Sequence, residues 1–273
     1  MNILYVDPLV SSGTSSNYKY YDGVYDELCK LCNVELHRGI PNNLSSKDID
    51  LILFGLGWFE HKYFGKIEGI DNYKKMSILF KPQNNLREKL KFCKFNAVDK
   101  ILTPVPDFEI YEQVTKIDTA LFPYGFSPET FFDRKINKNI DIGFSGALHE
   151  NKHYPSGAFP VPNIRTNIGK LLELRKDLNV FWSSKDGSPA RIPSYEEYAK
   201  KINSSKIWIA TQAAFGDITP RYYEVAASGA LLFCQKVPKQ YEHIFIDGVN
   251  CVQFENDLSD FEEKLDYYLQ NEL

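Results

Sequence analysis

The sequence predicts an α/β protein with two Rossmann-like, doubly wound domains that face each other across a cleft. Short apolar runs alternate with helical patterns, as expected for parallel sheets that helices cover on both faces. The alternation restarts near residue 140, after a polar, lysine-rich segment at 127–139. We therefore expect an N-terminal domain at 1–126, a linker at 127–139, a C-terminal domain at 140–256 and a C-terminal helix at 257–273.

Each element follows from its pattern of apolar residues. In the first domain we expect helices at 17–32, 85–95 and 107–117, and strands at 2–6, 49–57, 75–80, 98–105 and 119–126. In the second we expect helices at 163–176, 194–203, 220–228 and 238–245, and strands at 140–146, 179–184, 206–212, 230–234 and 251–254. The predicted C-terminal helix at 257–273 has one apolar face, made of Leu258, Phe261, Leu265, Tyr268 and Leu269.

Composition indicates a soluble globular protein, with 43% hydrophobic and 25% charged residues among 273. The net charge of −4 argues against general nucleic-acid binding. No apolar run approaches the ~20 residues of a membrane span, and the strand-like start lacks the pattern of a secretion signal. The five cysteines are an odd number in mostly apolar surroundings, which favours reduced thiols in the cytoplasm. Cys29 and Cys32 have no second pair at zinc-site spacing.

The charge is unevenly distributed along the chain. The region 62–100 holds ten Lys or Arg against four acids, whereas 255–273 holds seven acids and one lysine. The basic region is interpreted either as a solvated face or as a surface for peripheral contact with anionic lipid or an anionic acceptor.

The stretch DITPRYYEVAASGALLF, residues 217–233, combines several groups that could bind a ligand. A helix N-terminus has free N–H groups and partial positive charge, which suit a phosphate. Thr219 is expected to cap this helix after the strand, and Arg221 to add a bidentate donor to phosphate oxygens. Glu224, one turn on, would accept hydrogen bonds from two ribose hydroxyls. The alternative is that Arg221 and Glu224 form a weak surface pair at i,i+3 spacing.

The longer stretch from Asn203 to Phe254 resembles the C-terminal half of GT-B glycosyltransferases. It is most similar to the spore-maturation-type family, through the pattern RxxEalAsGa, and less so to exostosin-type transferases. The similarity covers roughly 140–270, and residues 1–125 match in pattern only. The resemblance implies that Glu224 binds the donor ribose and Arg221 a phosphate. Where many retaining members carry a further acid, this chain has Gly216 beside Asp217, so stereochemistry is not carried over.

A second constellation is FSGALHENKHYPSG, residues 144–157. As a strand-to-helix loop, it would direct backbone N–H groups of Ser145, Gly146 and Ala147 at a diphosphate, with His149 or Lys152 adding positive charge. His149, Glu150 and His153 also satisfy the HExxH pattern of zinc peptidases. The flanking glycines and proline disfavour the helix that such a site needs. An ordinary exposed loop is the third interpretation.

Three further residues are assigned by their position after strands. Arg165 opens the helix after that loop, where related proteins place a basic residue against phosphate; a solvent-facing arginine is the alternative. Arg191 and Ile192 lie in a loop expected to hold the nucleobase. This assignment follows from topology rather than from a motif.

The first domain is expected to hold the acceptor and a catalytic base. Asp7, Glu60 and His61 are the candidates, since each follows a strand and could take a proton from an acceptor hydroxyl. Each is also open to a purely structural interpretation.

Together these observations predict a hexosyl- or pentosyltransferase that moves a sugar from a nucleotide donor, UDP-linked, to a glycan or lipid-linked acceptor. The resemblance implies no metal or other cofactor, because helix dipoles and basic residues neutralise the leaving diphosphate. The alternatives are a noncatalytic nucleotide-sugar-binding protein and a zinc metallopeptidase.

Overall fold

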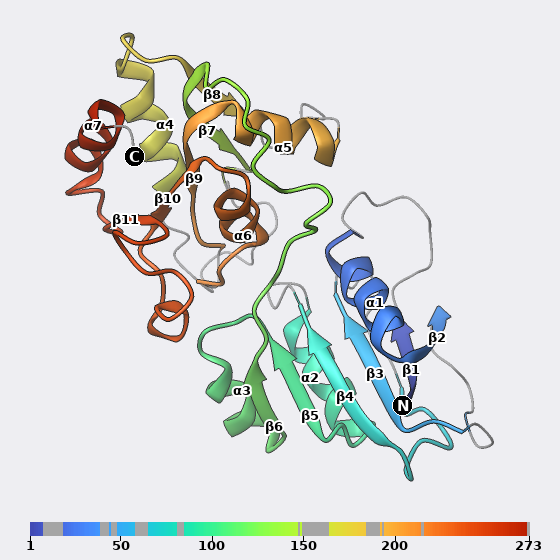
Figure 1. The fold of residues 1–273 in the computed structure, drawn as a ribbon. Coiled ribbons are helices and arrows are strands. Elements are labelled where there is room, and N and C mark those ends of the chain that lie inside the picture. Colours follow the sequence, from blue (N-terminus) through green and yellow to red (C-terminus); the bar gives the residue numbers. More distant parts are fainter. Residues whose placement is uncertain are drawn as a thin grey trace. The chain divides into compact units, whose positions relative to one another are not determined.

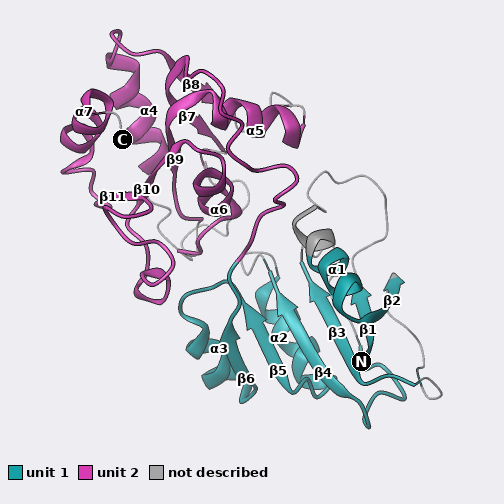
Figure 2. Ribbon diagram, viewed as in Figure 1, with its two compact units in different colours: residues 1–123 teal, residues 124–273 magenta. Residues whose placement is uncertain are grey.

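The computed structural model describes residues 1–7, 19–38, 44, 48–57, 65–80, 85–146, 148, 164–183, 192, 194–213 and 216–271. They divide into two compact units, Met1–Pro123 and Tyr124–Leu273 (Figure 2). Each unit is built around one parallel sheet with helices between its strands (Figure 1). The predicted α/β class with two Rossmann-like units is therefore confirmed.

The sheet of the first unit has six strands, all paired in parallel. In spatial order they are β2 (Asn33–Arg38), β1 (Asn2–Asp7), β3 (Leu51–Leu56), β4 (Lys74–Leu79), β5 (Lys100–Thr103) and β6 (Asp118–Leu121). Its helices are α1 (Lys19–Leu31), α2 (Leu86–Phe95) and α3 (Phe108–Thr115).

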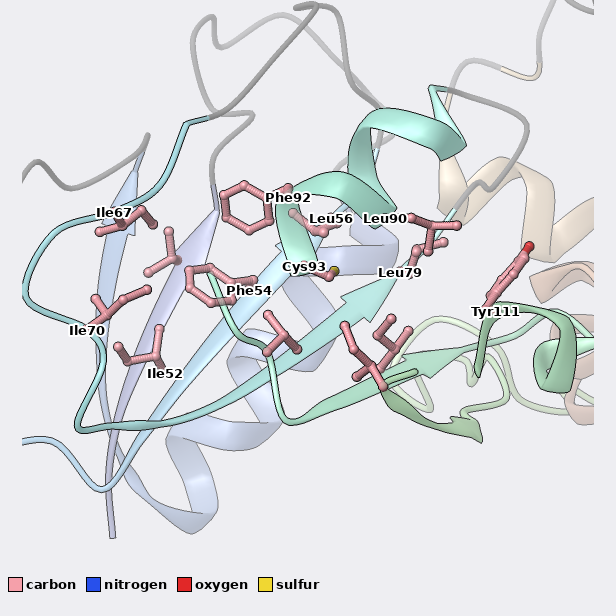
Figure 3. Packing of buried hydrophobic residues seen from close by; sticks show 14 of the residues in the cluster. Ile52, Phe54, Leu56, Ile67, Ile70, Leu79, Leu90, Phe92, Cys93 and Tyr111 are labelled. Carbon is pink, nitrogen blue, oxygen red and sulfur yellow. The ribbon is translucent and has the colours of Figure 1, made fainter. Parts of the chain in front are cut away.

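Helices cover both faces of this sheet, because alternate side chains of each strand point to opposite sides. On one face, Phe54 of β3 packs edge-on against Phe92 of α2, with 5.1 Å between ring centroids. Figure 3 shows both rings within the apolar cluster that α2 and α3 complete. On β1, Leu4 belongs to this cluster, whereas the neighbouring Tyr5 meets Tyr25 of α1. The continuous apolar strands thus reflect burial on both sides.

The basic region 62–100 carries less free positive charge than its composition suggests. Lys75 is buried and donates to the carbonyls of Ile70 and Tyr73, and the buried Lys89 donates to the carbonyl of Phe80. Three further lysines form ion pairs with acids: Lys66 with Asp71, Lys91 with Glu88, and Lys100 with Asp118. Contact of this region with a membrane stays a prediction.

The sheet of the second unit has five strands, again all parallel. In spatial order they are β11 (Val252–Phe254), β10 (Leu231–Gln235), β9 (Ser205–Ala210), β7 (Ile140–Ser145) and β8 (Val180–Ser183). The helical elements are α4 (Ile164–Leu174), α5 (Tyr195–Asn203), α6 (Pro220–Ala227), the 3-10 turn η1 (Lys239–Tyr241) and α7 (Phe261–Gln270).

The two faces of the second sheet have different partners. On one face α4 and α7 bury Ile168, Phe261 and Leu265 against the strands, as the apolar pattern of the tail predicts. On the other face α5 and α6 pack, and Trp208 of β9 fills the space above Gly143 of β7. A side chain at residue 143 would overlap the indole ring. The glycine therefore allows this close packing.

The predicted linker, 127–139, packs against the second unit. Phe131 is buried and meets Tyr198 of α5 edge-on. The backbone N–H of Arg134 donates to Asn203, 2.7 Å away, and its guanidinium pairs with Glu196. These contacts fasten the segment to α5.

Two elements differ from the sequence prediction. The strand β2 was not expected, because its residues follow the predicted helix at 17–32 and were assigned to no element. The helix expected at 238–245 is wrong, since only Lys239–Tyr241 forms a 3-10 turn there. The Asn250 side chain instead shapes the chain after this turn, since it donates to the carbonyl of Ile244 and accepts from the backbone N–H of Ile246.

Candidate functional site

The second unit has a topological switch point between β7 and β9. These strands are neighbours, with β8 on the far side of β7 and β10 on the far side of β9. Successive connections therefore leave in opposite directions, and at such a point open α/β sheets bind ligands in the crevice outside the carboxyl ends of the strands. Gly146 follows β7 at this edge, and Thr211 follows β9.

Arg221, in the first turn of α6, reaches this edge of the sheet. Its guanidinium carbon lies 5.8 Å from the centroid of the Phe144 ring, in β7. Its Nη2 lies 3.2 Å from the point where a Cβ at Gly146 would stand. The glycine thus leaves room for the guanidinium beside the end of β7. The structure brings together Arg221 and Gly146, but the Gly146 backbone N–H donates to the carbonyl of Ser183, 3.0 Å away, and so does not serve as the expected phosphate donor.

The N-terminus of α6 has an unsatisfied hydroxyl. Thr219 occupies the N-cap position and Pro220 the first helical turn, as expected. The Thr219 side chain makes no capping bond, however, and its buried Oγ1 has no hydrogen-bond partner among the described residues. A buried hydroxyl without a partner is costly, and at a functional site it points to a ligand or water that completes it.

Glu224 is not part of a surface ion pair. Only 2% of its surface is exposed, so the alternative interpretation of an exposed Arg221–Glu224 pair is wrong. Both side chains face the hydroxyl of Tyr198, whose pKa burial raises, with the Glu224 carboxylate raising it further and Arg221 lowering it. A carboxylate this deeply buried needs hydrogen-bonded or charged partners nearby. Arg221 supplies positive charge in the same cluster.

The Arg165 side chain is buried and is fixed by hydrogen bonds to the residues that follow β9. It is 4% exposed, which contradicts a solvent-facing arginine. Its Nε donates to the Thr211 hydroxyl, 2.6 Å away, and its Nη2 to the carbonyl of Gln212, 3.0 Å away. Gln212 is itself held by Gln235, which accepts from its backbone N–H. Arg165 thus connects the start of α4 to the end of β9.

The residues after β9 were missed in the sequence prediction. Thr211 and Gln212 lie at the carboxyl end of a central strand, which is the signal that would have found them. They organise the crevice by fixing Arg165.

Asp217 lies near Tyr241, in the turn after β10, and near Tyr223 of α6. Burial raises the pKa of Tyr241, and Tyr223 and Asp217 raise it further, so these three groups lie close together. Gly216 has a positive φ of 74°, a conformation that side chains rarely adopt. No carboxylate stands at residue 216, because it is a glycine. The carboxylate of the next residue, Asp217, lies near Tyr241 instead.

Several predicted site residues cannot be placed. Glu60, His61, Ala147, His149 and Arg191 lie outside the described residues, as do Glu150, Lys152 and His153 of the HExxH pattern. Ser145 ends β7, and Ile192 is half-buried. Asp7 is the last residue of β1, but only its backbone is described. Among the described residues no group of three potential metal-ligating side chains occurs.

The carboxy-terminal sequence is similar to a known family. Residues 168–273 match the family model described as glycosyl transferase-like. Over these residues the second unit is similar to a glycosyl transferase-like domain. The match includes α6 with Arg221 and Glu224, but it begins after Arg165. No curated protein sequence matches the chain.

Solved structures of GT-B glycosyltransferases share the fold. The sucrose-phosphate synthase of Thermosynechococcus elongatus is 11% identical, with a TM-score of 0.55 over 99% of this chain and 90% of that one. HepE of Anabaena, in complex with UDP and glucose, is 11% identical, with a TM-score of 0.51 over 98% and 90% of the two chains. The GT-B-like fold is thereby confirmed, while the resemblances to spore-maturation-type and exostosin-type transferases stay predictions. In the described part of the chain no helix has the length and apolarity needed to cross a bilayer.

Proposed function

We propose that the protein is a glycosyltransferase whose second unit binds a UDP-linked sugar at the ends of β7 and β9. The observation that carries this proposal is the position of Arg221 beside Gly146 at the switch point of a glycosyl transferase-like domain. The UDP complex of HepE, a structure of the same fold, supports the choice of nucleotide.

The diphosphate is assigned to the N-terminus of α6. There the Thr219 hydroxyl and the Arg221 guanidinium offer donors to phosphate oxygens, and the helix dipole adds partial positive charge. Gly146 adds room for the guanidinium rather than a donor, because its backbone N–H donates to the carbonyl of Ser183, 3.0 Å away. The backbone N–H of Ser145 is the remaining donor proposed at the end of β7. These groups stabilise the negative charge that grows on the leaving diphosphate, so that transfer proceeds without a divalent metal.

The ribose is assigned to Glu224. Its buried carboxylate has a fixed environment beside Arg221 and Tyr198, and a carboxylate accepts hydrogen bonds from two neighbouring hydroxyls well. The role of Arg165 changes from the expected direct phosphate contact to support of the crevice floor through Thr211 and Gln212.

The acceptor is a glycan or lipid-linked saccharide, and the first unit supplies the catalytic base, for which Asp7, Glu60 and His61 remain the candidates. The base is assigned to the first unit because the resemblance implies that the N-terminal domain binds the acceptor and the C-terminal domain binds the donor.

Binding to a panel of nucleoside diphosphates tests this function. Isothermal calorimetry with UDP, GDP, ADP and UMP should give the strongest binding for UDP, and a UDP-sugar should be hydrolysed or transferred in the presence of EDTA. UDP binding without hydrolysis or transfer would indicate the noncatalytic alternative. Stoichiometric zinc that is lost in His149→Ala would support the peptidase alternative instead.

A further inference from the structure

Tyr198, on α5, lies where three parts of the second unit meet. Its ring packs edge-on against Phe131, with centroids 5.9 Å apart and planes at 78°. It meets Trp208 of β9 in the same way, at 5.7 Å and 68°. Trp208 is fully buried above Gly143. The Tyr198 ring is therefore held between the segment after the first unit and the centre of the second sheet.

The hydroxyl of Tyr198 is buried and makes no hydrogen bond of good geometry among the described residues, although Arg221 and Glu224 lie close enough to act on it as hydrogen-bonding groups. Burying a phenol group without a partner costs roughly 1–3 kcal/mol, and native structures keep such groups mainly where they serve a purpose. The charged groups that act on this hydroxyl are Glu224 and Arg221. A buried donor without a well-formed hydrogen bond thus faces the two residues assigned to ribose and phosphate.

We propose that Tyr198 is a positioning residue of the nucleotide site, which donates a hydrogen bond to the Glu224 carboxylate when the nucleotide is bound. The inference rests on the proposed function, because it assigns Tyr198 to the same site. Tyr198 does not touch the nucleotide. It fixes one oxygen of Glu224 and so leaves the other directed at the ribose hydroxyls.

The chemistry suits this role. A phenol hydroxyl donates well to a carboxylate, and a hydrogen bond with one charged member is stronger than a neutral one. Burial and Glu224 both raise the pKa of Tyr198, so the phenol keeps its proton at neutral pH and remains a donor. The packed ring holds the oxygen in place, so that little side-chain entropy is lost when the bond forms.

Removal of the hydroxyl alone tests the proposal. Tyr198→Phe keeps the ring contacts with Phe131 and Trp208, so we expect a thermal midpoint close to that of the wild type. UDP affinity, measured by calorimetry, should fall about tenfold, as for loss of one charge-assisted hydrogen bond. Tyr195→Phe is the matched control, because Tyr195 lies on the same helix and its ring also meets Phe131. It should bind UDP like the wild type.

A ribose-specific readout separates positioning from a merely structural role. The wild type should prefer UDP over 2′-deoxy-UDP by about tenfold, the effect of one hydrogen bond to a charged group. In Tyr198→Phe that preference should fall to about threefold or less, because Glu224 is less well oriented. A general loss of structure would weaken both ligands equally and keep the ratio.

The outcomes distinguish the two proposals. If the wild type binds no UDP, the proposed function fails and the role of Tyr198 fails with it. If the wild type binds UDP and Tyr198→Phe keeps both its affinity and its ribose preference, only the role of Tyr198 is overturned. If Tyr198→Phe is destabilised, the double variant with Glu224→Gln decides: effects on UDP binding that simply add contradict the proposal, and non-additive effects support it.

Discussion

The guanidinium of Arg221 lies over the ring of Phe144, 5.8 Å from its centroid, and thereby connects the start of α6 to the end of β7. These residues are 77 positions apart in the chain, and the switch point of the sheet brings them together. An arginine that stacks on a ring keeps its planar donors directed along the ring face. The contact therefore orients Arg221 toward the crevice before any ligand arrives.

A methyl group at residue 146 should disturb this arrangement. In Gly146→Ala the new Cβ would lie 3.2 Å from Nη2 of Arg221 and 3.3 Å from Cζ of Phe144, so the guanidinium must shift. We expect UDP affinity to fall about tenfold, the cost of one misplaced charge-assisted bond, with a small change in thermal midpoint. Gly125→Ala is the control, because no heavy atom lies within 4 Å of its built Cβ. Unchanged affinity in Gly146→Ala would place the phosphate elsewhere.

Replacement of Arg165 should act first on stability. In Arg165→Met the Thr211 hydroxyl and the Gln212 carbonyl lose their buried donor, so the free energy of unfolding should fall by about 2–4 kcal/mol. Urea unfolding measures this change. Lys170→Met is the matched control on the exposed side of α4 and should change little. A stable Arg165→Met protein that no longer binds UDP would instead make Arg165 a direct phosphate ligand.

The ion pairs of Arg175 predict a pH dependence. Arg175 donates to Asp177 through Nε and Nη2, and pairs with Asp266 of α7 through Nη1. Its hydrogen bonds lower the pKa of Asp177 below the ordinary 3.8. A lowered pKa in the folded state stabilises the protein above the unfolded pKa, and this stabilisation is lost as the pH falls through the folded value. Asp177→Asn should therefore be less stable than the wild type at pH 7, with the difference shrinking below about pH 3.8.

Urea unfolding at pH 7 and at acid pH measures that difference. Because Asp177 is exposed, 0.5 M salt should also reduce it. A difference that grows on acidification would contradict the assigned sign.

The sequence predicts most of the fold because buried parallel strands leave a strong apolar signal. The strands at 140–146 and 206–212, for example, agree with β7 and β9 to within two residues at each end. The edge strand β2 escaped detection because it pairs only with β1 and stays partly exposed, so its sequence, NVELHR, is mixed. The helix at 238–245 was wrongly expected because Tyr241 and Phe245 have the i,i+4 spacing of a helix. Both side chains are buried, but the backbone there forms only a short 3-10 turn.

The site was predictable only in part. Arg221, Glu224 and Thr219 share one local motif, which a sequence displays directly. The place of Tyr198 depends on how α5 packs over Trp208, and that of Arg165 on the end of β9. Such contacts join residues far apart in the chain, and no local pattern records them.

The most direct test of the central claim is calorimetry of UDP binding to the wild type, Arg221→Ala and Glu224→Ala. The two removed side chains are assigned to phosphate and ribose, so each variant should lose about 1–3 kcal/mol of binding free energy, the usual cost of a lost charge-assisted hydrogen bond. Unfolding curves serve as the control for folding, since Glu224 is buried. Wild-type affinity for UDP in both folded variants would contradict a nucleotide site at α6.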